Sequence, residues 1–233
     1  MLAGCSDSPN DETVFGASVP VGSGTARAYV VSSAGEPVEM GVRLSDLAMT
    51  GLPAVGTVFL IPMPAEAVVV PYKHVTLNWN PVGHPPGAFS VPHFDTHFYI
   101  ISEAERNAIS PSDAQFATKA ANTPAAEFIP VGYGRDPGAI PDMGTHWTDP
   151  TAPEFTGQPF TRTFVYGSWN GAFTFYEPMF TKAYLESKPA VVAAALKLPS
   201  KYATPGLYPT SYKVGYDSNS KEWVIALSDL VAR

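Results

Sequence analysis

The chain has very little cysteine, little charge and no long apolar run. Its single cysteine, Cys5, cannot form an internal disulfide, so the hydrophobic core alone must stabilise the fold. No apolar run approaches the roughly 18 residues that a membrane-spanning helix needs. The sequence also has no internal repeat, and only 15% of its residues are charged. Long coiled coils are therefore excluded.

The charge that is present is mostly negative. The sequence carries 21 acidic and 14 basic side chains, which gives a net charge of −7. An acidic, lysine-poor surface attracts neither nucleic acid nor an anionic membrane face, so neither is expected as a partner. A small-molecule ligand of unknown identity and a homo-oligomer stay open.

The residues that are abundant predict a β-rich fold. The 24 prolines, the 19 glycines and the 12% of aromatic residues favour short strands joined by many turns. Asn170-Gly171 suits the two positive-φ positions of a type I′ turn and predicts a hairpin between residues 160–168 and 172–177. We expect a mainly β (α+β) protein, an antiparallel β-sandwich or barrel with a few short helices. A second hairpin is expected from residues 208–216 and 223–227, and a helix over most of residues 181–198, interrupted near Pro189.

The composition changes near residue 25. Residues 1–24 are small, polar and rich in glycine, which predicts a flexible, lipoprotein-like tether, and residues 25–233 are expected to form a single β-rich domain. Leu2-Ala3-Gly4-Cys5 resembles a bacterial lipobox, in which the cysteine carries the lipid. This pattern predicts an exported protein of the cell envelope, periplasmic or lipid-anchored, that contacts the membrane only through Cys5. An accidental tetrapeptide in a cytosolic protein is the alternative.

Three of the five histidines lie within 14 residues, at positions 84, 93 and 97. On a strand His93, Asp95 and His97 share one face. Residues two apart are about 6.6 Å apart at the backbone, so Asp95 can share an ion with either neighbour. Residues four apart are separated by about 13 Å, so His93 and His97 bind one ion only if the strand bends or bulges.

Two further groups are candidates for the same site. His146 lies in an irregular, glycine-containing loop, and Glu177 ends the strong hairpin on an otherwise apolar face. A carboxylate on such a face must be paired, protonated or coordinated. The pattern predicts a divalent transition metal, Zn²⁺ first and Fe²⁺, Mn²⁺, Ni²⁺ or Cu²⁺ as alternatives. The expected ligands are His84, His93, His97 and His146, with Glu177 and Asp95 as candidate catalytic groups, each a fourth ligand, an outer partner or a general base.

The chemistry of such a site leaves two functions open. A metal with an open position supports hydrolase, lyase or isomerase activity. Alternatively, the protein is a non-enzymatic binding or assembly module of the envelope whose histidines form a structural hydrogen-bond network.

Other residues have less specific expectations. His74 is expected to be structural. The run from Tyr133 to Asp136 fits either an anion clamp or a local salt bridge, and Trp79, Trp147, Trp169 and Tyr166 fit either a ligand pocket or the core.

Three segments together resemble a known family. Pro92-His93-Phe94-Asp95-Thr96-His97-Phe98-Tyr99, Met143-Gly144-Thr145-His146-Trp147 and residues 164–177 are similar to a bacterial family of exported proteins of unknown function with a Thermus representative. The resemblance covers about residues 25–190. It implies an exported, often lipid-anchored β-rich protein and no particular reaction. A faint similarity to the metal-binding strands of α-carbonic anhydrases and cupins carries no activity over, because Asp95 stands where a central histidine is expected.

Overall fold

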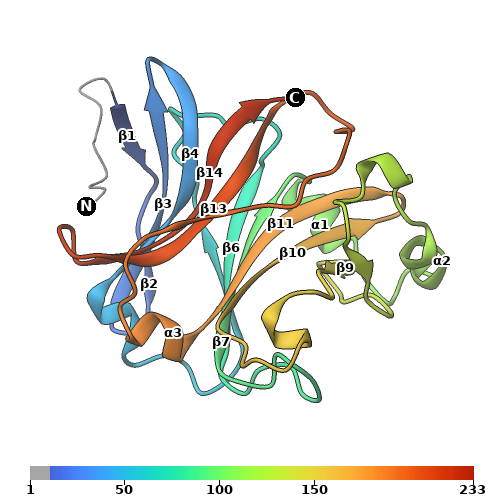
Figure 1. Ribbon diagram of the computed structural model, residues 1–233, viewed down its shortest axis with the longest axis horizontal. Coiled ribbons are helices and arrows are strands. Elements are labelled where there is room, and N and C mark those ends of the chain that lie inside the picture. The colour runs from blue at the N-terminus through green and yellow to red at the C-terminus, as the bar shows by residue number, and fades with distance from the viewer. Residues whose placement is uncertain (1–10) are drawn as a thin grey trace.

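A computed structural model describes residues 11–233 as two antiparallel β-sheets packed face to face (Figure 1). The first sheet has the strand order β1 (Asp11–Phe15), β3 (Gly24–Ser33), β4 (Glu36–Ser45), β14 (Glu222–Ala232), β13 (Leu207–Asp217) and β12 (Ala193–Ala195), and β2 (Val19–Val21) pairs with β3. The second has the order β5 (Thr57–Ile61), β6 (His74–Asn80), β7 (His93–Tyr99), β11 (Ala172–Thr181), β10 (Arg162–Trp169), β9 (Thr145–Thr148) and β8 (Gly134–Arg135). The expected mainly β fold is confirmed, as a sandwich and not a closed barrel.

The helices are short and lie outside the two sheets (Figure 1). They are α1 (Glu103–Asn107), α2 (Phe116–Ala121) and α3 (Lys182–Glu186), with 3₁₀ turns η1 (Asp46–Met49), η2 (Ala126–Phe128) and η3 (Pro153–Phe155). The α1 helix begins at Ser102, whose hydroxyl accepts a hydrogen bond from the Glu105 backbone while the Glu105 side chain accepts one from the Ser102 backbone. This capping box satisfies backbone donors that a five-residue helix would otherwise leave free.

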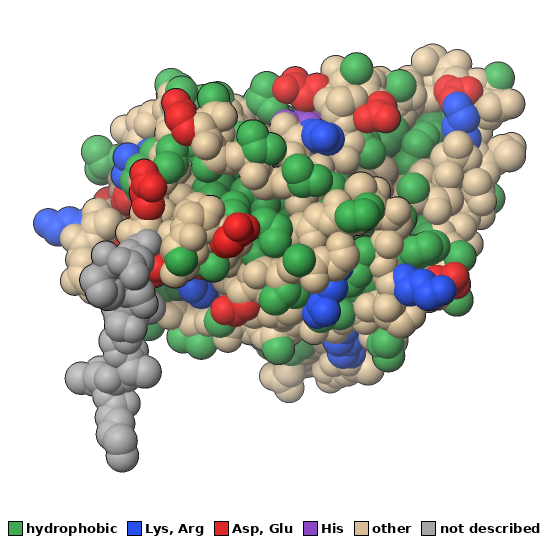
Figure 2. Space-filling model, turned by 90° about the horizontal axis from the view of Figure 1, so that it is seen from above, with side chains coloured by type: hydrophobic (Ala, Val, Ile, Leu, Met, Phe, Trp, Pro, Cys, Tyr) green, Lys and Arg blue, Asp and Glu red, His purple; other side chains and the backbone are tan. Residues whose placement is uncertain are grey.

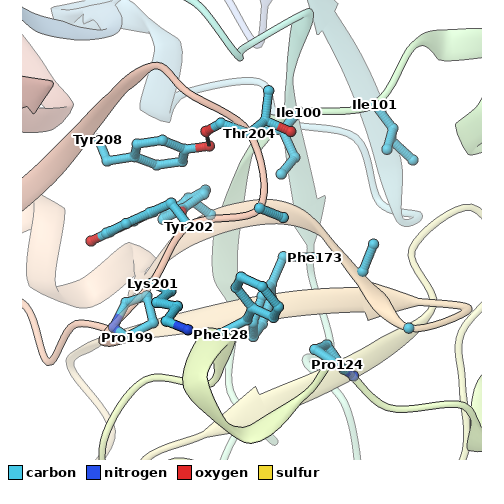
Figure 3. Close-up of a pocket in the computed structure, with 14 residues that line it drawn as sticks. Ile100, Ile101, Pro124, Phe128, Phe173, Pro199, Lys201, Tyr202, Thr204 and Tyr208 are labelled. Carbon is cyan, nitrogen blue, oxygen red and sulfur yellow. Dashed lines mark hydrogen bonds between the residues drawn. The ribbon is translucent and has the colours of Figure 1, made fainter. Parts of the chain in front are cut away.

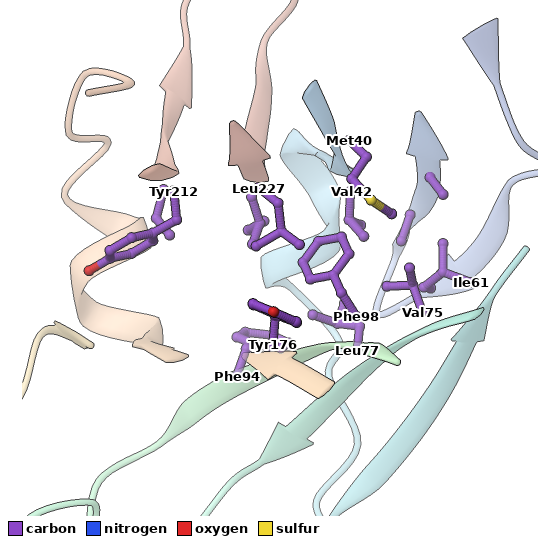
Figure 4. Close-up of a cluster of buried hydrophobic side chains, with 14 of the residues drawn as sticks. Met40, Val42, Ile61, Val75, Leu77, Phe94, Phe98, Tyr176, Tyr212 and Leu227 are labelled. Carbon is purple, nitrogen blue, oxygen red and sulfur yellow. The ribbon is translucent and has the colours of Figure 1, made fainter. Parts of the chain in front are cut away.

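The hydrophobic core lies between the sheets (Figure 4). Met40 and Val42 of the first sheet face Leu77 and Phe98 of the second, and none of these four side chains has solvent exposure. Complete burial of one such side chain contributes about 1.5–3 kcal/mol. Three of the aromatic residues that sequence alone left undecided between pocket and core belong to this core: Trp79, Trp147 and Tyr166.

The central strands β6, β7, β11 and β10 of the second sheet are buried on both faces, and β7 carries three of the site residues. All seven residues of β7 are buried. Because side chains alternate along a strand, Phe94 and Phe98 enter the core while His93, Asp95 and His97 occupy the other face. The loop of residues 81–92 covers part of this outer face, where Phe89 packs edge-to-face on Phe160 with 4.9 Å between ring centroids and tilted against His93 with 6.5 Å.

Both predicted hairpins are confirmed. Strands β10 and β11 pair around Asn170 and Gly171, whose φ angles of 49° and 85° are those that a type I′ turn requires. Strands β13 and β14 form the second hairpin, which is longer than expected at both ends.

Two expected segments differ in the structure. Residues 11–24 were expected to belong to a tether, yet they contain β1 and β2, which pair with β3. Residues 1–10, including Cys5, lie outside the described residues. Within residues 11–233 no helix combines the length and the hydropathy needed to cross a membrane.

The helix expected over residues 181–198 is wrong beyond its first turns. Helix α3 ends at Glu186, Lys188 adopts a positive φ of 49°, and Pro189 follows. Proline lacks the backbone donor that continues a helix, so the chain turns extended and Ala193–Ala195 pairs with β13 instead.

Candidate metal centre

The histidines and carboxylates of the outer face form two groups. One contains His84, His93 and Asp95, and the other contains His97, His146 and Glu177. Within each group the candidate ligand atoms lie within 4.8 Å of one another. Sequence reasoning considered His93, His97 and His146 as ligands of one ion, but the structure divides them between the groups. The reason is that β7 pairs with β6 in unbroken register, without a bulge that would bring residues 93 and 97 together.

Glu177 is the centre of its group. The register of the pairs flanking it places Glu177 on β11 opposite His97 on β7, and His97 Nε2 lies 3.3 Å from Glu177 Oε1. His146 Nε2, from β9, lies 3.8 Å from Glu177 Oε2. Both His97 Nε2 and Glu177 Oε2 are buried and have no hydrogen-bond partner. Unsatisfied buried polar atoms are costly, so this pair requires either a shared proton or an ion.

Gly167 leaves space for an aromatic ring that contacts both histidines of this group. Gly167 pairs with His146 on one side and with Phe175 on the other, so it lies between β9 and β11. A Cβ atom at this position would lie 2.0 Å from Cε1 of Phe175. The Phe175 ring therefore occupies the space above Gly167 and packs against both His97 and His146, at centroid distances of 4.7 and 5.3 Å.

Asp95 is the centre of the other group, and it has one hydrogen-bond donor and one ion-pair partner, although Asp95 Oδ1 and His93 Nε2 lack hydrogen-bond geometry. Asn80 Nδ2 donates a hydrogen bond of 2.7 Å to Asp95 Oδ2, and His93 Nε2 lies 3.1 Å from Asp95 Oδ1. His93 Nδ1 donates to the carbonyl oxygen of Val91 at 2.7 Å, which fixes the orientation of the ring. His84, nearly half exposed, lies 3.8 Å from Asp95.

The two groups differ in their protonation. Burial raises the pKa of Glu177 well above its ordinary value, and the charges of Asp95 and Asp136 raise that pKa further. Burial lowers the pKa of His97 to about 3 and that of His146 to about 4. Without an ion, burial therefore favours a protonated carboxyl and two neutral imidazoles in the Glu177 group.

The Asp95 group instead forms an ion pair. Burial alone would raise the pKa of Asp95, but the contact with His93 and the charges of the surrounding histidines outweigh it and hold the pKa below its ordinary value. Burial alone would lower the pKa of His93, but the contact with Asp95 and its negative charge outweigh burial, so the pKa of His93 is raised. The contact between the two side chains therefore favours a carboxylate on Asp95 beside an imidazolium on His93.

Both groups face one cavity of about 670 Å³, the size of a small-molecule site. Asp95, Glu177, His84 and His146 line it together with apolar side chains such as Phe89 and Met143. His93 and His97 are completely buried, whereas His84 is partly exposed; the face seen from above in Figure 2 shows a small area of histidine between other side chains.

A second cavity lies elsewhere and contains no histidine. Its volume is about 250 Å³, and it is lined by Phe128, Phe173, Tyr202 and Tyr208, with Lys201 among them (Figure 3). Neither of these two cavities is lined by any of the four aromatic residues proposed from sequence as pocket walls.

Other residues were missed or differently placed. Asn80 was missed, although its position on β6 opposite His93 follows from the pairing of the two strands. Arg135 does not pair with Asp136: Arg135 donates to the Ala120 carbonyl, and Asp136 lines the histidine cavity. His74 lies outside both groups and stacks on Tyr99 with 4.5 Å between ring centroids.

Comparison with known proteins gives one partial match. No curated protein and no solved structure matches the chain. A family model described as "TTHB210-like: Hypothetical protein TTHB210" matches residues 32–79. The matched segment runs from the end of β3 to β6 and stops before His84, so it carries no information on the two groups. Over these residues the chain is similar to an uncharacterised, Thermus-type protein family.

Proposed function

We propose that this protein binds one divalent transition metal ion, Zn²⁺ first, through His97, His146 and Glu177. The observation that carries the proposal is the convergence of two imidazole nitrogens and a carboxylate, of which His97 Nε2 and Glu177 Oε2 are buried without a hydrogen-bond partner. Two ligand atoms of one tetrahedral Zn²⁺ lie about 3.3 Å apart. The distances of 3.3 and 3.8 Å from the histidine nitrogens to Glu177 are close to this spacing.

Charge balance favours this group over the Asp95 group. Within residues 11–233 Glu177 has no ion-pair partner except the two histidines, whose pKa values burial lowers to about 3 and about 4. A divalent cation would supply the missing charge and allow Glu177 to ionise. Asp95 has its imidazolium and its amide donor already, so a metal there would have to displace a proton from His93.

A two-histidine, one-carboxylate set leaves a coordination position open, and Glu177 and His146 line the cavity. When bound, such an ion supplies Lewis-acid chemistry for a hydrolase, lyase or isomerase. Asp95 faces the same cavity and is held ionised, which suits a carboxylate that accepts a hydrogen bond from a bound molecule and orients it.

The experiment is elemental analysis of protein purified without a nickel column. We expect about one metal ion per chain, lost in Glu177→Gln and retained in His84→Ala. Wild-type protein without metal, and without a rise in Tm on adding Zn²⁺, would contradict the proposal. Two ions per chain, one of them lost in His84→Ala, would show that Asp95 binds a metal ion and would contradict its assignment as the ion-pair partner of His93.

The second candidate is a non-enzymatic binding or assembly module. The hydrogen bonds of Asn80 to Asp95 and of His93 to the Val91 carbonyl favour it, because they tie half of the cluster into a structural network. The absence of metal in the purified protein, with wild-type stability in Glu177→Gln, would favour this function over the first.

We further propose that the protein is exported and anchored in the cell envelope by a lipid on Cys5. The tetrapeptide Leu2-Ala3-Gly4-Cys5 supports this proposal. Labelling with radioactive palmitate in cells that express the gene from its own locus should mark the membrane fraction and fail for Cys5→Ser. Unlabelled protein in the cytosol would contradict it.

A further inference from the structure

Asp136 is the one carboxylate on the histidine cavity that has neither an ion-pair partner nor a place in the two groups. It lines the cavity of about 670 Å³ and is half-buried. Thr148 Oγ1 donates a hydrogen bond of 2.7 Å to Asp136 Oδ1. Among residues 11–233 no lysine, arginine or histidine forms a salt bridge with it. A partly buried carboxylate without a cation is costly, and burial raises its pKa accordingly.

The backbone fixes Asp136 in this position. Its N–H donates to the His146 carbonyl at 2.9 Å, and Arg135 pairs with Trp147, so the short strand β8 lies directly beside β9. The guanidinium of Arg135 is turned away and donates to the Ala120 carbonyl at 3.0 Å. The Asp136 carboxylate therefore lines the cavity, whereas the Arg135 guanidinium does not. This arrangement is the opposite of the anion-binding site considered from sequence.

The rest of the cavity agrees with this polarity. Its charged lining residues are the acids Asp95, Asp136 and Glu177, and neither lysine nor arginine lines it among the described residues. Phe89, Ile140, Met143 and Val165 supply apolar walls. A phosphate or carboxylate would find no cationic side chain here, whereas an ammonium group would find the free oxygen of Asp136.

A metal ion is a poor occupant at Asp136 itself. None of the groups of three potential ligands within residues 11–233 includes this residue. Its Oδ1 already accepts the Thr148 hydroxyl. A single remaining carboxylate oxygen is a suitable partner for one N–H donor of an organic cation but a weak site for a divalent ion.

We propose that the histidine cavity binds a small organic cation, whose ammonium group is held by Asp136 and whose apolar body fills the space along Phe89 and Met143. This inference rests on the proposed function in that it names the ligand class of the same cavity. Ligand binding and metal content are measured separately, so that either can fail without the other.

The probes are three molecules with one apolar body: phenylbutylamine, phenylbutanol and phenylbutyrate. Calorimetric titration into full-length protein, both metal-free and zinc-loaded, should rank the amine first and the carboxylate last. Because a hydrogen bond to a charged group is lost, Asp136→Asn should weaken amine binding about tenfold or more and leave the alcohol within about twofold. Asp136→Glu should retain part of the preference. Asp11→Asn, an exposed carboxylate on the other sheet, is the control for net charge and should change nothing.

Three titration results would overturn the inference: tightest binding by phenylbutyrate, equal weakening of all three probes by Asp136→Asn, or no binding of any probe. Loss of zinc from Asp136→Asn in the metal analysis would overturn it as well. The last would make Asp136 part of the metal site. A wild-type protein that holds no metal but prefers the amine through Asp136 would support this inference while contradicting the proposed function.

Discussion

His97 and Glu177 lie opposite each other on neighbouring strands, with His97 Nε2 3.3 Å from Glu177 Oε1 and both side chains almost completely buried. This contact lacks hydrogen-bond geometry, so His97 Nε2 has no hydrogen-bond partner, and Glu177 Oε2 has none either. A buried imidazole and a buried carboxyl at this distance are stable as a neutral pair or as the ligands of a cation. This relationship is the basis of the first two predictions.

His97→Ala should lose the metal and the stability that the metal provides. An ion present at about 100 times its Kd stabilises the folded state by about 2.7 kcal/mol, so the zinc-dependent rise in Tm should disappear. His84→Ala is the matched control, because it removes an imidazole from the other group and should keep the rise. A zinc-dependent shift of wild-type size in His97→Ala, measured by calorimetry, would show that His97 is not a ligand.

Glu177→Gln should change how the stability of the metal-free protein depends on pH. The folded state holds the Glu177 proton above pH 4.5, the ordinary pKa, whereas the unfolded state releases it. The folded state then binds more protons, so this group lowers the free energy of unfolding by about 1.4 kcal/mol per pH unit as pH rises toward its raised pKa. Glutamine mimics the protonated acid and lacks this loss.

The measurement is urea denaturation in the presence of a chelator, across the range from about pH 5 to pH 8. The difference between wild type and Glu177→Gln isolates this residue from the histidines, and the variant should gain relative stability as pH rises. A constant difference would mean that Glu177 is ionised in the metal-free protein. With Zn²⁺ added, the order should reverse, because only wild type binds the ion.

Asp95→Asn should destabilise the protein without removing the metal. Removal of one partner of a buried ion pair costs about 3 kcal/mol, since His93 is left as an unpaired cation or must lose its proton. Asp95 contributes stability above pH 3.8, lost as pH falls through its lowered pKa, and His93 contributes stability that is lost as pH rises through its raised pKa. The deficit of the variant, measured by denaturation, should therefore be largest between these two limits, and its zinc content should equal that of wild type.

His74→Phe should reduce the sensitivity of the protein to acid. Burial lowers the pKa of His74 to about 4 from an ordinary value of 6.5. Between these values the unfolded state binds a proton that the folded state refuses, so stability falls as pH falls, by about 1.4 kcal/mol per pH unit. Phenylalanine keeps the stacking on Tyr99 and does not titrate. If denaturation between about pH 4 and pH 6 showed the same slope in both proteins, His74 would have to be accessible to protons in the folded state.

Gly167→Ala should disturb the centre without touching a ligand. The new methyl group would meet the Phe175 ring at 2.0 Å, and moving that ring disturbs its contacts with His97 and His146. Overpacking of this kind costs about 1–3 kcal/mol, and zinc affinity should fall as well. Gly134→Ala is the control, because Gly134 also lies on a strand of the same sheet but has no atom within 4 Å of an added Cβ. Equal effects of the two substitutions would contradict this role of Gly167.

Local chemistry in the chain was enough to predict the mainly β fold and the hairpin at Asn170-Gly171, because strand periodicity and turn type depend on residues close in sequence. It was not enough for residues 190–198, where alanine and leucine favour a helix but Pro189 and an available edge of β13 favour a strand. Nor did composition distinguish β1 and β2 from a tether, since their partners lie on β3.

The candidate residues themselves could be identified from sequence, because a cluster of histidines with Asp95 and a carboxylate on an apolar hairpin face are unusual in a chain with so little charge. Their division into two groups was decided only in the folded sandwich. Strand pairing places Glu177 opposite His97, Gly167 leaves room for the Phe175 ring that packs on both His97 and His146, and Asn80 and His93 both contact Asp95. Asn80 and Asp95 lie 15 positions apart and His97 and Glu177 lie 80 positions apart, and the geometry of the site depends on the register of five strands, which no local pattern specifies.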